Sequence, residues 1–268
     1  MPGNINMGKN HPQSGKADHH GPQLYSEIDK IFFSDGWVLA KEHLEKDLCM
    51  ENILSMSSTL YDAVDGLIDS FSKRCKAEGK NIDCSKGCYL CCCQTVLILP
   101  YEVLCIVNYI NNNLSRNERG EIIERAVQKD NVTRHMKVQE FLSYKDPCPL
   151  LKNGACMVYQ ARPMACRTYL SSSSSGCRNE YDNPKDIDIF PDLYEFTIRA
   201  GRMMNEGISA YLIEKQIFPT EWQIESSLHT AFSEDQAFER WLDGENIFHK
   251  RNYSDDEIKY LNRFGSTK

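Results

Sequence analysis

Apolar and polar positions alternate with the period of an α-helix over most of the chain. The clearest stretch lies in residues 24–79, where one apolar stripe is formed by Leu60, Val64, Leu67, Ile68 and Phe71. Gly79 follows this stripe and is typical of the glycine that closes a helix. Helical spacing returns in residues 193–212 and 222–241, and a short terminal helix is expected near residues 255–264. The pattern therefore predicts a mainly α protein.

Local signals place two helix starts in the middle of the chain. Residues 94–99 (QTVLIL) are short, apolar and β-branched, which predicts a strand or buried connector, and Pro100 suits the first turn of the next helix. Ser115 and Glu118 have the spacing of a capping box, in which the hydroxyl and the carboxylate each accept a hydrogen bond from a free amide. A polar amphipathic stretch is expected from there to about Leu142.

Residues 146–186 break the helical pattern. Residues 171–175 are all serine, and the rest of the segment is punctuated by Pro147, Pro149, Gly154, Pro163, Gly176 and Pro184. An irregular segment of this length inside a compact domain needs something other than an apolar stripe to hold it. Its cysteines are the candidates, because metal binding by loops supplies folding free energy.

Cysteine is unusually frequent in this chain, with 12 in 268 residues. The N-terminus is polar and lacks the apolar stretch of a secretory signal, so we expect a cytoplasmic protein. In a reducing compartment, cysteines in such numbers favour metal ligation over a disulfide framework.

Charge and composition exclude some classes of function. The 31 basic and 38 acidic residues give a formal net charge of -7, without the basic excess that binding a nucleic-acid backbone demands, and no window is apolar enough to span a membrane. Residues 1–22 hold almost nothing that could pack and are predicted to be a disordered tail. We expect one domain in residues 23–268, in which N-terminal helices (23–80) and C-terminal helices (188–268) bracket an irregular cysteine module (84–186).

Nine of the cysteines fall in two groups. The first group lies in one short loop and comprises Cys84, Cys88, Cys91, Cys92 and Cys93; the second comprises Cys148, Cys156, Cys166 and Cys177. Spacings of two and three residues let thiolates converge on a soft metal, and Gly87 gives the loop backbone freedom. Adjacent cysteines usually point apart, so Cys91 and Cys92 are expected to serve different metals or different faces of one site. Cys93 is expected to be the non-ligand of its group. Cys75 and Cys105 continue helical stripes and are expected to be core residues.

The two groups together resemble the zinc- or iron-chelating cysteine-cluster family, which is YkgJ-like. The shared pattern is C-x3-C-x2-C-C at Cys84 to Cys92, then CP-L…G-x-C-x-V-Y-x-x-RP-x-x-CR from Cys148 to Arg167, and a closing Cys177 after the serines. The resemblance covers about residues 84–186. It implies a metal site with the ligands Cys84, Cys88, Cys91, Cys92, Cys148, Cys156, Cys166 and Cys177. Flagellin lysine N-methylases belong to this family and imply an enzymatic alternative, a protein-lysine methylase or other S-adenosylmethionine-using enzyme.

A second resemblance comes from Cys84, Cys88 and Cys91, whose spacing matches the three-cysteine motif of radical S-adenosylmethionine enzymes. In those enzymes the motif follows a β-strand of an α/β barrel, whereas here a predicted helix precedes it and helices dominate after it. The usual aromatic residue before the third cysteine is also displaced, since Tyr89 lies one position early. The pattern disfavours a radical barrel, while a cluster outside a barrel that binds the same cofactor stays open.

Zinc and iron–sulfur clusters both accept four thiolates. The three-cysteine loop with a distant fourth ligand, the Cys148-Pro149 pair and the lack of histidine near either group favour an iron–sulfur cluster of the [4Fe–4S] type over zinc. Near the cofactor, Arg162 and Arg167 would offset thiolate charge, and Tyr159 and Tyr169 could donate to its sulfurs. We therefore expect redox or modifying chemistry at the centre, as in an iron–sulfur oxidoreductase, with a protein substrate or partner. The rival hypothesis is a zinc-stapled, non-catalytic protein-binding module.

Overall fold

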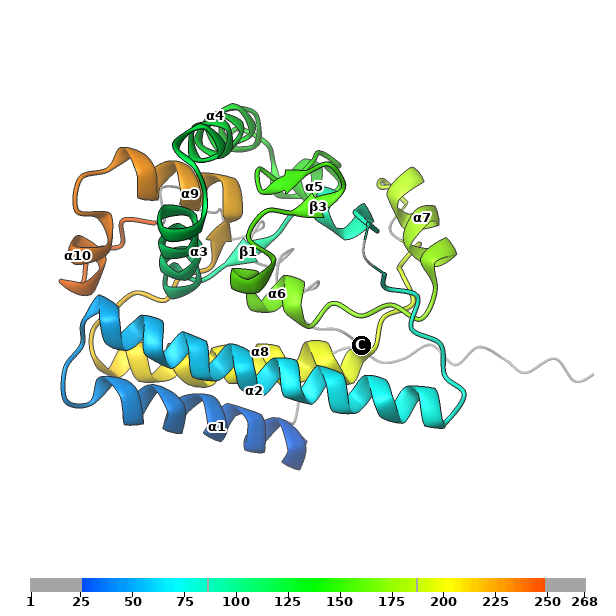
Figure 1. Ribbon diagram of the computed structural model, residues 1–268, viewed down its shortest axis with the longest axis horizontal. Coiled ribbons are helices and arrows are strands. Elements are labelled where there is room, and N and C mark those ends of the chain that lie inside the picture. Colours follow the sequence, from blue (N-terminus) through cyan, green and yellow to red (C-terminus); the bar gives the residue numbers. More distant parts are fainter. Residues whose placement is uncertain (1–25, 86, 187, 249–268) are drawn as a thin grey trace, which may run out of the picture.

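The structure, a computed structural model, describes residues 26–85, 87–186 and 188–248 (Figure 1). The N-terminal half contains α1 (Glu27–Leu44), α2 (Met50–Ala77), η1 (Leu90–Cys93), β1 (Leu97–Ile98), α3 (Pro100–Asn113), α4 (Arg116–Thr133) and α5 (Val138–Leu142). The rest contains β2 (Leu151–Lys152), β3 (Ala155–Cys156), η2 (Tyr159–Ala161), α6 (Met164–Arg167), α7 (Ser174–Asp182), α8 (Glu195–Glu214), β4 (Trp222–Gln223), α9 (Ile224–Ser233) and α10 (Ala237–Leu242). The mainly α fold class is confirmed. The predicted tail (1–22) and terminal helix (255–264) lie outside the described residues.

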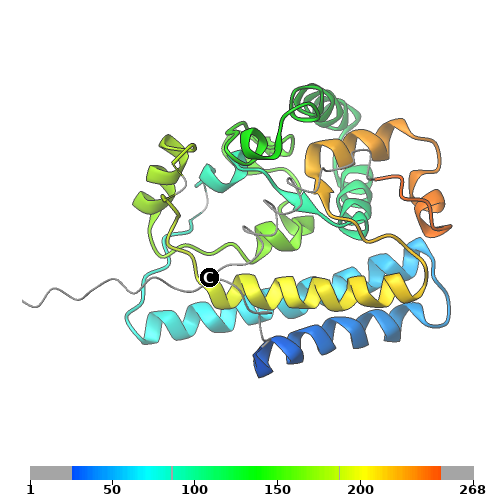
Figure 2. The same ribbon diagram turned by 180° about the vertical axis from the view of Figure 1, so that it is seen from behind.

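Helices α1, α2 and α8 form one layer of the molecule, and α1 and α8 run in the same direction (Figures 1 and 2). Two glycines let these helices touch through their backbones. A Cβ at Gly36 would lie 2.1 Å from the Met204 carbonyl oxygen, and one at Gly207 would lie 2.1 Å from the Phe33 carbonyl oxygen. The N-terminal and C-terminal helical segments therefore pack on each other.

A second group of helices lies beside this layer. β1 pairs antiparallel with β4, with Leu97 opposite Gln223, and the chain then enters α9, which packs on α3 and α4. Pro100 begins α3 and the Ser115–Glu118 capping box opens α4, as predicted. The helix does not continue to Leu142, because α4 ends at Thr133 and the Glu140 carboxylate accepts from the Lys137 amide to start α5.

The cysteine module consists of loops and short elements, as its prolines and glycines predict. α7 is the exception, since the serine run begins a helix instead of a loop. The Ser173 hydroxyl accepts from the Gly176 amide and caps α7. The module lies against the layer of α1, α2 and α8, mainly through α6. Across the described ranges, no helix has the length and apolarity needed to cross a bilayer.

Candidate metal centre

The first group of cysteines lies on a single loop between α2 and β1. Cys84 and Cys88 are exposed in the approach to η1, and Gly87 between them has a φ of 95°, a left-handed conformation that favours glycine. Cys91, Cys92 and Cys93 lie in η1, a single tight turn in which Cys93 is buried. This turn places three consecutive cysteines in one short element.

The second group comes from three different elements. Cys148 precedes the hairpin of β2 and β3, and Cys156 ends that hairpin opposite Leu151. Asn153 and Gly154 make the turn with positive φ values of 53° and 74°. Cys166 lies in α6 and Cys177 in α7, and Cys177 is buried.

Hydrogen bonds join the two groups. The Cys148 amide donates to the Cys92 carbonyl at 2.7 Å, and the Asp146 amide donates to the Cys93 carbonyl at 3.1 Å. On the other side of the loop, the Ser171 amide donates to the Cys84 sulfur at 3.2 Å. Segments about 55 and 90 residues apart in sequence therefore meet at the cysteine loop.

The thiols are close enough to affect one another electrostatically. A hydrogen bond with Cys92, together with burial, raises the pKa of Cys91 well above its usual range. Burial raises the pKa of Cys166, and nearby Cys148, Cys91 and Cys156 raise it further. Crowded, buried thiolates repel each other, so a cation among them would lower the free energy of the deprotonated state.

The donor chemistry fits a soft metal, because the converging side chains are thiols. The side chains are not arranged as a closed site, since no three His, Cys, Asp or Glu residues in the described part of the chain are grouped to hold an ion as they stand. The fit with zinc or an iron–sulfur cluster thus rests on the donor set and on the hydrogen bonds that bring its loops together.

Comparison with known families agrees with the cysteine pattern. Residues 83–191 match the model of the CxxCxxCC family, described as "Putative zinc- or iron-chelating domain". The resemblance to a chelating cysteine-cluster family is confirmed for this segment. No curated protein and no solved structure matches the chain. The match begins next to Cys84 and ends before α8, so it covers the cysteine module and leaves out the helical layer.

The two arginines predicted to line the cofactor tie the cysteine module to α2. Asp65 of α2 forms ion pairs with both Arg162, at 3.1 Å, and Arg167. The Arg167 guanidinium lies 4.1 Å from the Tyr61 ring centre, and its side chain is 1% exposed. Arg162 lies over Tyr159 and is close enough to Cys156 to lower that thiol's pKa against the effect of burial. Of the two arginines, Arg162 is the one that affects Cys156, a thiol of the family pattern. Both arginines already pair with the Asp65 carboxylate.

The two predicted tyrosines have different surroundings. Tyr159 is 62% exposed, and its ring is covered by Arg162. Tyr169 is half-buried and its hydroxyl accepts from the Gln94 amide at 3.3 Å. Burial raises the pKa of Tyr169, and the nearby Cys177 and Cys91 add to this rise. Of these two tyrosines, Tyr169 is the one with thiols among its close neighbours.

Three groups beside the cysteines have no local sequence signal. Glu180 of α7 pairs with Lys145 and accepts from Gln94 at 2.9 Å, which fastens α7 to the cysteine loop. Glu102 of α3 is buried and accepts from the Met164 amide at 2.6 Å, which fastens α6. Asp65 is the third. Each joins residues more than 30 positions apart, so spacing along the chain could not identify them.

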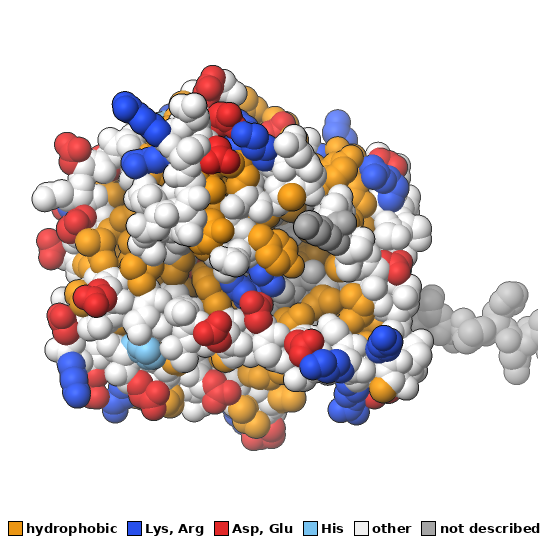
Figure 3. Space-filling model, in the orientation of Figure 1, with side chains coloured by type: hydrophobic (Ala, Val, Ile, Leu, Met, Phe, Trp, Pro, Cys, Tyr) orange, Lys and Arg blue, Asp and Glu red, His pale blue; other side chains and the backbone are white. Residues whose placement is uncertain are grey.

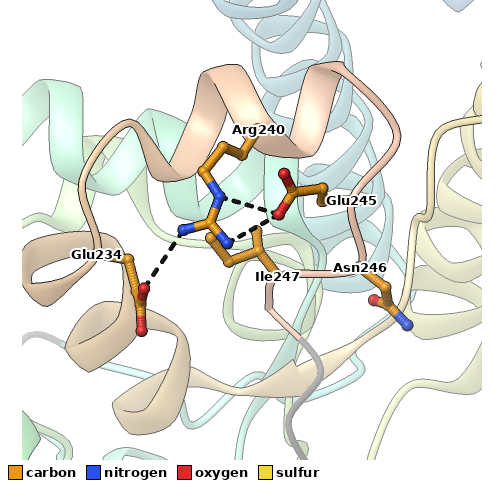
Figure 4. A pocket seen from close by; sticks show the side chains of 5 residues that line it. All are labelled: Glu234, Arg240, Glu245, Asn246 and Ile247. Atoms are coloured by element: carbon orange, nitrogen blue, oxygen red, sulfur yellow. Dashed lines mark hydrogen bonds and ion pairs between the residues drawn. The ribbon is translucent and has the colours of Figure 1, made fainter.

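Of two hollows on the surface, one is lined by a cysteine and the other is not. One of about 380 Å³ is lined by Gly87, Cys88, Tyr89, Leu90, Ser174, Ser175 and Arg178. Another of about 370 Å³ lies at the C-terminal helices and contains no cysteine (Figure 4). There Arg240 is bound by Glu245 at 2.8 Å and Glu234 at 3.4 Å, so its charge is already offset. Figure 3 shows hydrophobic side chains gathered in the middle of one face, with charges of both signs around them. The hollow at Cys88 is therefore the better candidate for access to the thiols.

Proposed function

We propose that the chelating domain binds an iron–sulfur cluster or zinc through eight cysteines and carries redox or modifying chemistry at that centre. The ligands are Cys84, Cys88, Cys91, Cys92, Cys148, Cys156, Cys166 and Cys177. The observation that carries the proposal is the hydrogen bonding of Cys148 to Cys92 and of Ser171 to Cys84, which gathers loops rich in thiols at one place. An iron–sulfur cluster is favoured over zinc for the sequence reasons given above.

The groups around the thiols set their protonation and so their readiness to bind a metal. Burial raises the pKa of Cys148 to about 12, so this thiol is protonated near neutral pH until a metal displaces the proton. The Arg162 guanidinium favours the thiolate of Cys156, and Ser171 donates to the Cys84 sulfur. A bound iron–sulfur cluster would supply electron transfer, and zinc would supply structural cross-linking or Lewis acidity. Metal binding would release protons and become tighter as pH rises.

A zinc-stapled, non-catalytic module is the second candidate, favoured by the arginines. Arg162 and Arg167 both pair with Asp65, an arrangement that fixes the chelating domain to α2 instead of leaving two cations free for a substrate. A partner protein would then bind the exterior of a rigid module. In contrast, the alternative of an S-adenosylmethionine-using enzyme gains no support from the fold, because α2 precedes the cysteine loop and the described strands are two residues long.

The metal and the ligands can be tested together on anaerobically purified full-length protein. We expect iron and acid-labile sulfide with brown colour, and loss of metal in Cys88→Ser and Cys166→Ser. Cys105→Ser is the control, since Cys105 is buried in α3 outside the family pattern and should lose stability without losing metal. Colourless protein with stoichiometric zinc would favour the stapled module. Protein that binds neither metal would overturn the proposal.

A further inference from the structure

We propose that two basic residues of α4, Arg125 and Lys129, are positioning residues for Cys148, and this inference rests on the proposed function. Both side chains bind the backbone next to this cysteine, one on each side of it. α4 contains no cysteine, so the proposal gives this helix a part in the metal centre that the cysteine pattern does not.

The sequence around Cys148 leaves backbone carbonyls that need donors from elsewhere. Residues 146–149 read Asp-Pro-Cys-Pro, and a proline has no amide hydrogen. These four residues lie in neither a helix nor a strand, so no regular ladder of hydrogen bonds serves them. Backbone carbonyls removed from water then have to find other donors.

Lys129 holds the segment before Cys148. Its Nζ donates to the Asp146 carbonyl at 2.7 Å and to the Pro147 carbonyl at 3.3 Å. The lysine side chain is 7% exposed, and the Asp146 carboxylate lies farther from Nζ, at 3.8 Å. A buried ammonium is costly unless acceptors surround it. The lysine and the segment therefore stabilise each other.

Arg125 holds the segment after Cys148. It lies four residues before the lysine and so on the same face of α4. Its Nε donates to the Pro149 carbonyl at 2.9 Å, and its Nη2 lies 3.4 Å from the Met157 sulfur. The Glu121 carboxylate is a more distant partner, at 3.9 Å. One face of a single helix thus binds carbonyls on both sides of the cysteine.

The backbone of Cys148 completes the arrangement. Its amide donates to the Cys92 carbonyl at 2.7 Å, and its carbonyl accepts from the Leu151 amide at 2.9 Å. With the two α4 side chains, these bonds fix the chain at Cys148 and on either side of it. A ligand whose backbone is already fixed loses less conformational entropy when it binds a metal. Loss of the α4 contacts should therefore weaken the hold of Cys148 on the metal, as loss of outer partners does at other metal sites.

The test compares Lys129→Met with Lys129→Arg in full-length protein as isolated. Methionine keeps an unbranched side chain but has no donor, whereas arginine keeps the charge and the donors. A coloured chelator of the metal found measures the rate of metal release, and amide hydrogen exchange follows the Cys148 amide. Lys129→Met should make both rates about tenfold faster, and Lys129→Arg should stay within about threefold of the native protein. Arg125→Met should change both rates in the same direction as Lys129→Met.

Lys152→Met is the matched control. Lys152 also links the hairpin of β2 and β3 to α4, but it does so through the Glu121 carboxylate, at 2.7 Å. Its ammonium has no printed contact with the carbonyls of residues 146–149, and its side chain is 36% exposed. Both rates should therefore stay within about twofold of the native values.

The outcomes separate this inference from the proposed function. Native protein that contains metal and releases it no more slowly than Lys129→Met would overturn the positioning role, and so would an unchanged exchange rate at Cys148. A role in packing alone would make methionine better tolerated than arginine, which is the reverse of the expected order. If Lys129→Met does not accumulate, Arg125→Met decides, because that side chain is 34% exposed. Native protein without metal would contradict the proposed function, and the positioning role would fall with it.

Discussion

The interface of α1 with α8 and the cysteine module bury their residues in different ways. α1 and α8 have 18 and 20 residues and meet through Gly36 and Gly207, with the ion pair of Asp29 and Arg199 at one end. In the cysteine module β2 and β3 have two residues each and α6 has four, while Cys148 and Cys166 are half-buried thiols with raised pKa values. Packing between the two helices holds α1 against α8 without any added group. The loops, in contrast, bring thiols together whose thiolates repel one another unless a cation binds between them.

The largest expected effect is at the helical interface. Gly207→Ala places a Cβ against the Phe33 backbone, which cannot move without shifting α1, so we expect the free energy of unfolding to fall by about 3 kcal/mol. Gly66→Ala in α2 is the matched control, because nothing lies within 4 Å of its Cβ, and it should stabilise the helix by about 0.5–1 kcal/mol. Urea denaturation of the metal-loaded proteins measures both. Equal effects of the two substitutions would mean that α1 and α8 are not in backbone contact.

Glu102 joins the two regions and predicts a pH dependence. Burial raises its pKa from the ordinary 4.5 to about 7, although the Leu99 and Met164 amides donate to its carboxylate. A raised pKa gives stability that is present below pH 4.5 and is lost as pH rises through 7. The stability of the native protein relative to Glu102→Gln should therefore fall by about 2 kcal/mol between pH 5 and pH 8. Parallel pH profiles would show that Glu102 titrates as it does in the unfolded chain.

The contact of the cysteine module with α2 predicts a smaller effect. Asp65→Asn removes the anionic partner of Arg167, whose side chain is fully buried, but Asp65 itself is 47% exposed and solvent screens the pair. We expect a loss of about 1.5 kcal/mol in the free energy of unfolding, with metal content retained. Asp69→Asn, one turn further along α2, breaks only the exposed pair with Lys73 and should cost about 0.3 kcal/mol. Equal losses of unfolding free energy in Asp65→Asn and Asp69→Asn would show that the contact of Asp65 with Arg167 does not stabilise the protein.

The smallest expected effect is a gain in stability. Cys49 is the N-cap of α2 and its side chain makes no capping hydrogen bond. Serine at this position can accept from a free amide of the first turn, so Cys49→Ser should raise the free energy of unfolding by about 0.5 kcal/mol. Metal content should stay unchanged, because Cys49 lies outside the family pattern. A drop in metal content would show that the ligands extend beyond the cysteine module.

Local features of the sequence predict most of the fold. The capping box of Ser115 and Glu118, Pro100 at the start of α3 and Gly79 after α2 each depend on residues within one turn, and all three predictions are confirmed. The cap of α7 was missed because Ser173 lies inside a run of five serines, where composition suggests a loop. Its spacing to Gly176 was the available signal.

The sequence predicts the cysteines of the candidate site, but not the residues that hold their segments in place. Regular spacing and the family pattern select the eight cysteines directly from the chain, although which of them bind metal stays a prediction. The contacts of Asp65 with Arg167 and of Ser171 with Cys84 join residues 102 and 87 positions apart. Such contacts depend on how the helical layer positions the loops, and a local sequence pattern does not predict that arrangement.

Amide hydrogen exchange on metal-loaded and metal-depleted protein tests the contrast between the two regions most directly. If the metal holds the loops, its removal should accelerate exchange in residues 84–186 by about a hundredfold or more, because that segment loses the binding free energy. Amides at the contact of α1 with α8 should change much less, since backbone packing at Gly36 and Gly207 holds them. Equal acceleration in both regions, or none in residues 84–186, would contradict the claim that packing holds one region and metal the other.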